Sequence, residues 1–527
     1  IYSGGLGILA GDYLKEASDS NVQIMGVGLL YRFGYFKQKL GPKGEQLTIY
    51  EAEEFSRIPI NPVKDDEGKH LTVSIVWPGR SVKVRVWEAK IGKVSLFLLD
   101  TDFEDNTPED RSITHYLYGG DHENRLRQEL ILGIGGIRAI NAMGLKPDLY
   151  HSNEGHSAFI SLERLRKLIE DHHLTFDQAV EAVRSSTLFT THTPVPAGHD
   201  AFEEDLLRKY ISHYHSRLNI SWDDLMALGR CPGEADRRFN MSYLATHMSQ
   251  ELNGVSKLHG QVTQGLFNKL WPGYLKEELY VGYVTNGVHH PTWVAPEWQA
   301  IYKEITGTVN FDQTDRSLWE KVYNVDDKRI YEVKMSLKKK LFVNIRKRLQ
   351  TEMIDKHVSP RTLLNISTHL NEKALTIGFA RRFATYKRAS LLFRDLDRLA
   401  KIVNDPDRPI QFIFAGKAHP HDGGGQDLIK RVFEISQMPR FAGKVIFLEN
   451  YDIELAKQLV RGVDIWLNTP TRPLEASGTS GEKAVMNGTL HFSVLDGWWV
   501  EGYRAFAGWA LPKKRTFNNQ ELQDDVD

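Results

Sequence analysis

Residues 475–483 (Glu-Ala-Ser-Gly-Thr-Ser-Gly-Glu-Lys) form the stretch whose residue types most suggest chemistry. They follow an apolar run at 463–467 and lead into a segment of helical character at 483–487. Glycines let a ligand approach the backbone closely, and the free N–H groups at a helix start favour anions. Lys483, just inside that helix, is unfavourable for the helix dipole. A desolvated lysine amine suits attack on an aldehyde such as pyridoxal, although an isolated glycine turn with a Lys is more often an ordinary solvated turn.

Two other stretches combine charge or glycine with a predicted helix start. Residues 379–388 (Phe-Ala-Arg-Arg-Phe-Ala-Thr-Tyr-Lys-Arg) place Arg382 and Lys387 five residues apart in a loop. A guanidinium fork and an ammonium together suit an oxyanion, whereas without context such a pair is more often a solvated basic face. Residues 4–7 (Gly-Gly-Leu-Gly) predict a loop before a helix at 8–17, which is either an anion cradle or a plain tight turn.

The elements that must position these residues alternate between strands and helices. Polar residues follow the predicted strands at 148–151, 186–191 and 280–285, and open parallel sheets bind ligands at that end of their strands. A charged helical region at about 318–357 precedes a second series of alternating strands and helices. The strands predicted in that second series are 375–379, 410–415, 445–448, 463–467 and 490–494.

The predicted architecture is α/β, with two doubly wound Rossmann-like domains that face a cleft. We place the N-terminal domain at residues 1–286 and the C-terminal domain at 287–527. Residues 46–103 alternate apolar and polar side chains, which predicts antiparallel strands and a β-rich insertion in the N-terminal domain.

Composition limits the class of protein. The chain has 527 residues, of which 41% are hydrophobic and 26% charged, and a net charge of −1, so no basic field points to nucleic acid or an anionic membrane. Its single cysteine, Cys231, excludes an intramolecular disulfide and fits the reducing cytoplasm. No apolar run is long enough to span a bilayer. The first residue is not Met and the acidic end at 518–527 lacks a cap, so we expect a fragment.

Residues 475–488, followed by Val-Leu-Asp-Gly at 494–497, closely resemble the pyridoxal-phosphate (PLP) segment of the α-glucan phosphorylases, which act on glycogen, starch or maltodextrin. The resemblance implies the B-type glycosyltransferase (GT-B) fold and PLP attached to Lys483. It also implies that inorganic phosphate cleaves terminal α-1,4-glucosidic bonds of a glucan, giving α-D-glucose 1-phosphate with retention of configuration. The resemblance implies no metal. Family members are commonly dimers, which makes a homodimer possible here, and the oligomeric state of this chain stays open.

The resemblance extends to residues elsewhere in the chain. It implies that Arg382 and Lys387 bind the substrate phosphate, and that His192, in Thr-Thr-His-Thr at 190–193, hydrogen-bonds the glucosyl unit. A lone His after a strand is more often structural. The contacts to the cofactor would come from Gly5, Trp293, Arg381, Tyr451, Thr479, Ser480 and Lys483. The other contacts to the sugar would come from Leu6, Gly7, Asp121, Asn286, Glu475, Ser477 and Gly478.

Departures from the family pattern point to its short bacterial and archaeal branch. Asp452 and Ser480 stand where animal and plant enzymes have Arg and Gly. Glu482 replaces an apolar Met directly before Lys483, and we expect little effect because adjacent helix positions do not face each other.

Two alternatives remain at this point. A nucleotide-sugar glycosyltransferase such as a glycogen synthase shares the fold, the glycine loop and the Arg/Lys pair. Such enzymes typically carry a second Glu eight residues after the first, where this chain has Lys483 eight residues after Glu475. The other alternative is an inactive fragment that only binds glucan.

Overall fold

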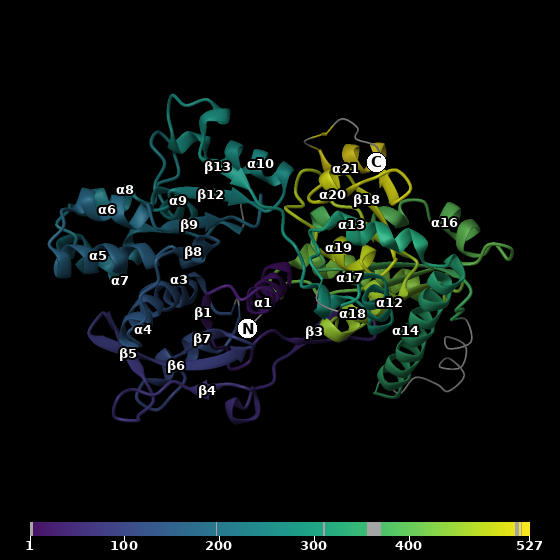
Figure 1. Ribbon diagram of the computed structural model, residues 1–527, viewed down its shortest axis with the longest axis horizontal. Helices are drawn as coiled ribbons and strands as arrows, with labels where there is room; N and C mark the ends of the chain where they lie inside the picture. The colour runs from purple at the N-terminus through teal and green to yellow at the C-terminus, as the bar shows by residue number, and fades with distance from the viewer. Residues whose placement is uncertain are drawn as a thin grey trace. The chain divides into compact units, whose positions relative to one another are not determined.

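The computed structural model describes residues 4–117, 119–195, 198–308, 311–355, 370–511, 516–517 and 519–527. The chain divides into two compact units (Figure 1). Unit 1 comprises Ile1–Phe36, Tyr50–Asn286 and Pro473–Ser477, and unit 2 comprises Lys37–Ile49, Gly287–Arg472 and Gly478–Asp527. The domain boundaries derived from the sequence treat each domain as one continuous stretch and stay a prediction.

A largely antiparallel sheet lies in unit 1, where the alternating pattern predicts one. Its described strands are β1 (Met25–Leu29), β4 (Asn61–Pro62), β5 (Thr72–Trp77), β6 (Arg80–Ile91) and β7 (Val94–Asp100). Their order is β1-β7-β6-β4, with β5 also paired to β6, and only β1 and β7 run parallel. The core face of β6 is formed by Val82, Val84 and Val86, which are fully buried. The strands of the predicted insertion therefore belong to the same sheet as β1, which precedes the insertion in the sequence.

A second, parallel sheet of unit 1 consists of β8 (Tyr150–Asn153), β9 (Thr187–Thr190), β12 (Glu251–Gly254) and β13 (Val281–Tyr283). The order β13-β12-β9-β8 follows the chain without reversal, so this described sheet is not doubly wound as predicted. Strand β12 was not expected, because its sequence, Glu-Leu-Asn-Gly, is short and mostly polar. A small antiparallel pair, β10 (Ala201–Phe202) and β11 (Phe239–Asn240), completes the described strands.

The helices of unit 1 include one correction to the sequence analysis. Helix α1 (Gly4–Asp19) already begins at Gly4, so residues 4–7 form its first turn and not a loop before it. A single π-helical turn at Ile131–Gly135 joins α3 (His122–Leu130) to α4 (Gly136–Ala142). The others described are α2 (Pro108–Arg111), α5 (Ile160–His172), α6 (Phe176–Arg184), α7 (Glu204–Arg217), α8 (Trp222–Ala227), α9 (Met241–His247) and α10 (Lys257–Phe267).

Unit 2 is built on a six-stranded sheet with all strands parallel. The strands are β14 (Leu375–Ala380), β15 (Ile410–Ala415), β16 (Val445–Leu448), β17 (Ile465–Asn468), β18 (Leu490–Val494) and β19 (Gly508–Leu511). The order β16-β15-β14-β17-β18-β19 reverses between β14 and β17. This is the doubly wound order, and its reversal point is where such sheets open a crevice for ligands.

Helices flank this sheet, and a separate two-stranded hairpin from the N-terminal part of the chain bonds loops that follow its strands. The hairpin strands are β2 (Lys37–Leu40) and β3 (Gln46–Ile49), and Gln38 bonds Asn450 and Gly416. The charged helical region predicted at about 318–357 contains two α-helices within the described residues, and Asp326, which accepts from the Lys328 N–H, precedes the second. The described helices are α11 (His290–Trp293), α12 (Pro296–Thr306), α13 (Arg316–Glu320), α14 (Asp327–Asp355), α16 (Leu396–Val403), α17 (Gly423–Gln437), α18 (Ile453–Gly462), α19 (Ser480–Val485), α20 (Trp499–Gly502) and α21 (Gln520–Val526).

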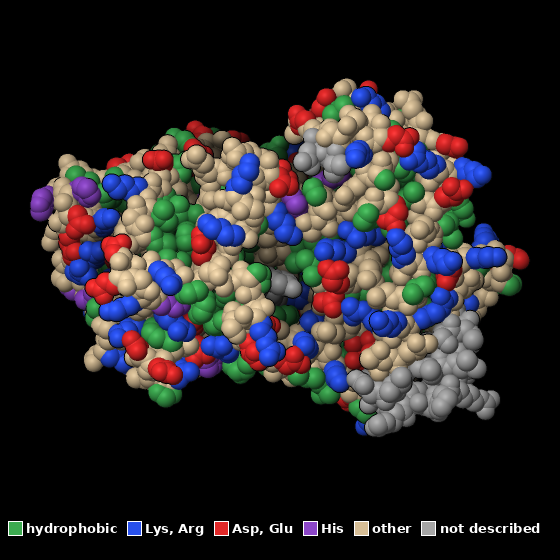
Figure 2. Space-filling model, turned by 60° about the horizontal axis from the view of Figure 1, so that its bottom comes forward, with side chains coloured by type: hydrophobic (Ala, Val, Ile, Leu, Met, Phe, Trp, Pro, Cys, Tyr) green, Lys and Arg blue, Asp and Glu red, His purple; other side chains and the backbone are tan. Residues whose placement is uncertain are grey.

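The surface mixes charges of both signs. On the face drawn in Figure 2, Lys and Arg side chains are interspersed with Asp and Glu. Within the described part of the chain, no helix has the length and apolarity to cross a membrane.

Candidate active-site residues

Lys483 lies in the short helix α19, which begins at Ser480, three residues earlier than the sequence predicts. Its side chain is buried, with 6% of the residue exposed. The amine donates to Thr479 Oγ1 at 3.4 Å and lies 4.1 Å from the centroid of the Trp293 ring. The structure thus brings together three residues that the sequence assigns to one cofactor.

The backbone around Lys483 and Trp293 is held by two side chains that the sequence analysis did not name. Asn487, which is fully buried, donates to the Lys483 oxygen at 2.8 Å and the Trp293 oxygen at 3.1 Å. Arg461 donates from Nε to the same Trp293 oxygen at 2.9 Å. An Asn amide and an Arg fork have enough donors to fix several carbonyls at once.

Arg381 lies at the reversal point of the unit 2 sheet. Its guanidinium donates to Asn468 Oδ1 at the end of β17, and Asn468 donates in turn to Ser493 Oγ at 3.0 Å. Gly416 must be glycine here, because its φ is +154° and a Cβ would lie 2.0 Å from the Arg381 oxygen. A cation therefore lies at the point of the strand order where doubly wound sheets bind ligands.

Arg382 and Lys387 lie on the loop after β14. Arg382 is exposed, whereas Lys387 is buried with its amine 4.7 Å from the centroid of the Tyr386 ring. Arg388 holds the loop: it donates to the Thr469 and Pro470 oxygens at 2.8 and 2.9 Å and pairs with Asp527 at 2.7 Å. The sequence analysis gave Arg388 no role, although it belongs to the quoted stretch.

Tyr451 and Ser480 also belong to unit 2. Burial raises the pKa of the Tyr451 hydroxyl, and the Arg381 charge opposes that rise, so the phenol lies within the field of the guanidinium. Ser480 Oγ accepts from Trp466 Nε1 at 3.1 Å. Lys417, which the sequence analysis missed, follows β15, and burial lowers its pKa to about 8 while Asp452 opposes that shift.

These unit 2 residues have the chemistry that PLP requires. A buried amine beside a tryptophan face suits attachment of an aldehyde, and guanidinium, hydroxyl and backbone N–H groups of the same unit are of the types that suit its phosphate. Across the described residues, no group of three or more His, Cys, Asp and Glu side chains could hold a metal ion.

His192 lies in unit 1, just beyond strand β9. Its Nε2 is 2.9 Å from Asn153 Oδ1. Burial is the main cause that lowers the pKa of His192 to about 3, so the imidazole is neutral at physiological pH. Because an amide oxygen only accepts, the Asn153 contact assigns the proton to Nε2. The ring is therefore a neutral hydrogen-bonding group of fixed orientation.

Glu154 holds the backbone of His192 through its side chain. Its Oε1 accepts from the His192 N–H, and its backbone N–H donates to the Thr190 oxygen at 2.9 Å. The residue is 5% exposed and has a φ of +65°, which is uncommon for a residue other than glycine. Burial raises the pKa of the Glu154 carboxyl to about 8. The sequence analysis gave Glu154 no role.

The remaining predicted residues divide between the units. Asp121 is exposed and caps α3 by accepting from the Asn124 N–H at 2.8 Å, which is a structural role. The Ala476 oxygen accepts from Ser256 Oγ at 2.7 Å, which ties Glu475 and Ser477, both buried, to unit 1. Unit 1 also contains Gly5, Leu6, Gly7 and Asn286, whereas Gly478, with a φ of +85°, begins the last segment of unit 2.

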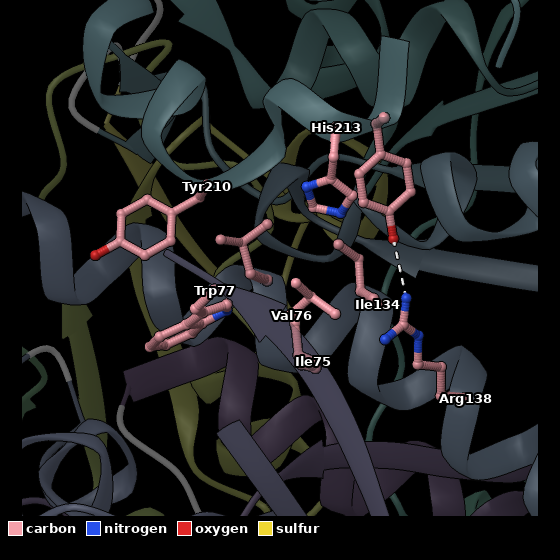
Figure 3. A pocket seen from close by; sticks show the side chains of 9 residues that line it. Ile75, Val76, Trp77, Ile134, Arg138, Tyr210 and His213 are labelled. Carbon is pink, nitrogen blue, oxygen red and sulfur yellow. Dashed lines mark hydrogen bonds between the residues drawn. The ribbon is translucent and has the colours of Figure 1, made fainter. Parts of the chain in front are cut away.

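Two surface hollows of unit 1 contain none of the predicted site residues. The first, in Figure 3, lies between β5, the π-helical turn with α4, and α7, and its rim includes Trp77, Arg138 and Tyr210. The second has a volume of about 340 Å³, and in it Asp102 pairs with Arg32 at 2.7 Å and Arg111 at 2.9 Å.

The chain is similar in sequence to known proteins of one family. Residues 146–507 match the carbohydrate phosphorylase family. The chain is 42% identical to a glycogen phosphorylase of Mycobacterium tuberculosis, with 100% of this chain and 62% of the relative covered. It is 44% identical to a maltodextrin phosphorylase of Thermococcus litoralis, with 97% and 60% covered, and 40% identical to a glycogen phosphorylase of Aquifex aeolicus, with 100% and 75% covered.

The chain therefore spans about 60% of the length of the first two of these relatives. The matched region includes the segments around Lys483, Arg382 and His192, which carry the resemblance in the sequence. The chain belongs to the carbohydrate phosphorylase family.

Proposed function

We propose that this chain carries α-glucan phosphorylase activity: inorganic phosphate cleaves the terminal α-1,4-glucosidic bond of glycogen, starch or maltodextrin and α-D-glucose 1-phosphate forms with retention. The observation that carries the proposal is the buried amine of Lys483 beside Trp293 and Thr479. The names of the relatives, glycogen phosphorylase and maltodextrin phosphorylase, support the same reaction.

PLP is the proposed cofactor, attached to Lys483. The residues that would hold it are Gly5, Trp293, Arg381, Tyr451, Thr479 and Ser480, of which all but Gly5 belong to unit 2. When bound, PLP supplies a phosphate group that exchanges a proton with the substrate phosphate. Two phosphates repel each other, so cations near them are needed, and Arg381, Arg382 and Lys387 are the cations we assign to that task.

The glucan contacts are assigned to unit 1. Neutral His192 offers one hydrogen-bonding edge to the glucosyl unit, because Asn153 and Glu154 fix its ring and its backbone. The proposed sugar-binding residues are Leu6, Gly7, Asp121, His192, Asn286, Glu475, Ser477 and Gly478. In the reaction, a phosphate oxygen forms a bond to the anomeric carbon, the glucosidic C–O bond breaks, and the departing glycosidic oxygen takes up the proton carried by the substrate phosphate and becomes a hydroxyl.

The wider setting is also a proposal. The family resemblance supports a GT-B-type fold with two domains facing a cleft, and a homodimer in solution. We place the protein in the cytoplasm, because its single cysteine suits a reducing compartment.

Reduction with borohydride tests the cofactor assignment directly. We expect the purified chain, incubated with PLP and reduced, to carry one pyridoxyl label, and peptide mass mapping to locate it on Lys483. Lys483→Ala should lose the label and all turnover of maltodextrin with phosphate. The control is Lys457→Ala, which removes an exposed ion pair to Glu454 on α18 and should change neither.

A chain that takes up no pyridoxal label contradicts the proposal. Binding of a nucleotide sugar to that chain would then indicate the glycosyltransferase alternative, and binding of maltodextrin alone would indicate an inactive fragment.

A further inference from the structure

Lys334, on the long helix α14, is surrounded by acceptors from two other elements. Its amine donates to Thr489 Oγ1 at 2.9 Å and to the oxygens of Arg461, Val463 and Asn487 at 3.0, 3.2 and 3.3 Å. An ammonium has three donors, so these four acceptors use all of them. Two of the oxygens lie at the end of α18, and the other two acceptors lie in the turn that follows α19.

At Arg461 and Val463, this position matches what the C-terminal end of α18 lacks. The last carbonyls of a helix have no partner within the helix, and a cation near them is favourable for the helix dipole. Helix α19 has only six residues, and helices so short are not stable without surrounding contacts. Its orientation therefore depends on the groups that hold its two ends.

The stem of Lys334 also packs against the turn. Gly488 has a φ of +66°, and a Cβ there would lie 3.3 Å from Lys334 Cδ and 3.0 Å from Trp298 Cζ2. The turn after α19 is thus enclosed by Lys334 on one side and by the Trp298 ring on the other, with no space for a larger residue.

From this turn, hydrogen bonds lead to the candidate cofactor lysine. Asn487, whose oxygen accepts from Lys334, donates through its side chain to the oxygens of Lys483 and Trp293. Its Oδ1 accepts from the Ala295 N–H at 2.8 Å. One residue held by Lys334 therefore fixes both the backbone of Lys483 and the segment that carries the Trp293 ring.

We propose that Lys334 is a positioning residue for Lys483: it holds the turn after α19 and so sets the place of the amine that receives the cofactor. Among the described residues, Lys334 donates its hydrogen bonds to the end of α18 and to the turn after α19, and it acts on Lys483 through Asn487. This inference rests on the proposed function, because it assumes that Lys483 holds PLP.

The matched control is Lys338, one helical turn further along α14. It is also buried, donates to the Ala374 oxygen at 2.7 Å and pairs with Asp464 at 2.6 Å, but these partners do not belong to α19 or to the turn after it. Lys334→Met and Lys338→Met each remove one buried ammonium and keep a long apolar stem.

The experiment loads each variant with PLP and follows the release of the cofactor during dialysis by its near-ultraviolet absorbance. We expect Lys334→Met to release PLP about tenfold faster than wild type, the scale of losing one or two hydrogen bonds. Lys338→Met should release it at the wild-type rate, with a comparable loss of thermal stability. Lys334→Arg, which keeps a cation, should recover part of the retention.

Equal release rates for the two Met variants would overturn the proposal, since Lys334 would then be an ordinary buried lysine. If Lys334→Met does not fold, Lys334→Gln keeps a neutral donor and is compared with Lys338→Gln in the same way.

A readout without cofactor separates this inference from the proposed function. Hydrogen exchange of the α19 amides in the cofactor-free chain should be faster in Lys334→Met than in Lys338→Met. If the wild-type chain never labels at Lys483 but the exchange differs, the proposed function fails while the positioning of α19 stands. If the label forms and neither exchange nor release differs, the positioning role fails alone.

Discussion

The indole ring of Trp293 lies 4.1 Å from the amine of Lys483, although the two residues are far apart in the sequence. Trp293 belongs to α11 at the start of unit 2, and Lys483 belongs to α19 near its end. The ring face attracts a cation and excludes water from the amine. The contact therefore prepares a site at which a lysine side chain is both held and desolvated.

Replacing this ring tests its contribution. We expect Trp293→Leu to weaken PLP binding about twofold to thirtyfold, because a desolvated cation–π contact contributes about 0.5–2 kcal/mol. Titration of the cofactor-free chain with PLP measures the change. Trp509, which is 49% exposed, provides the control: Trp509→Leu should leave PLP affinity unchanged. Unaltered affinity in Trp293→Leu would show that the ring only fills space.

Asn487 has a close structural counterpart at an exposed position. Asn404 also donates to the oxygen four residues before it, at 2.8 Å, and to a distant oxygen, that of Arg440, at 2.9 Å. Asn487→Ala should lower the free energy of unfolding by about 2–4 kcal/mol, because it leaves several buried backbone groups without partners. Asn404→Ala should cost less than about 1 kcal/mol, because water replaces the amide. Denaturant titration compares the two, and equal losses would contradict the argument from burial.

Glu154 should make stability depend on pH in a defined window. Burial raises the pKa of its carboxyl in the folded chain to about 8, above the value near 4.5 expected when unfolded. The folded state therefore binds more protons between these values, and the stabilisation it gains at low pH is lost as pH rises towards 8. Glu154→Gln keeps an acceptor for the His192 N–H and cannot ionise, so it should remove this loss.

Unfolding free energies of wild type and Glu154→Gln, measured from pH 5 to pH 8.5, check this expectation. The variant should gain relative to wild type as pH rises, by up to about 1.4 kcal/mol per pH unit midway between the two pKa values, and the gain should level off as pH passes 8. Parallel curves would mean that the carboxyl is ionised in the folded protein.

Arg382 and Arg388 should separate function from stability. Arg382 is exposed, so Arg382→Ala should leave the free energy of unfolding within about 0.5 kcal/mol of wild type and raise the KM for phosphate. Arg388 is buried among two carbonyls and the Asp527 carboxylate, so Arg388→Ala should cost about 3–5 kcal/mol. Phosphate-dependent kinetics and denaturant titration give the two readouts. A normal KM for phosphate in Arg382→Ala, with only glucan binding damaged, would contradict the phosphate assignment.

The sequence by itself determined the family, the chemistry of the reactive stretch and most strands. Residues 475–488 were sufficient to indicate the family, because the match is long. A short Gly-rich turn with a Lys occurs in many unrelated proteins. The strands of unit 2 were readable because strands buried on both faces are continuous apolar runs. The short polar strand β12 could not be predicted in this way. It is a strand because it pairs with β9 and β13, and its own side chains do not indicate one.

Only the tertiary structure decided which residues hold the reactive ones in place. Asn487, Arg461 and Lys334 donate to backbone oxygens of distant segments. Because every residue has a backbone oxygen, the residue type of the acceptor does not reveal such a bond in the sequence. The same holds for Glu154, whose effect on His192 depends on a left-handed backbone and on burial. The chemical type of each side chain can be read from the sequence. Its burial and its backbone hydrogen-bond partners are fixed only when the chain has folded.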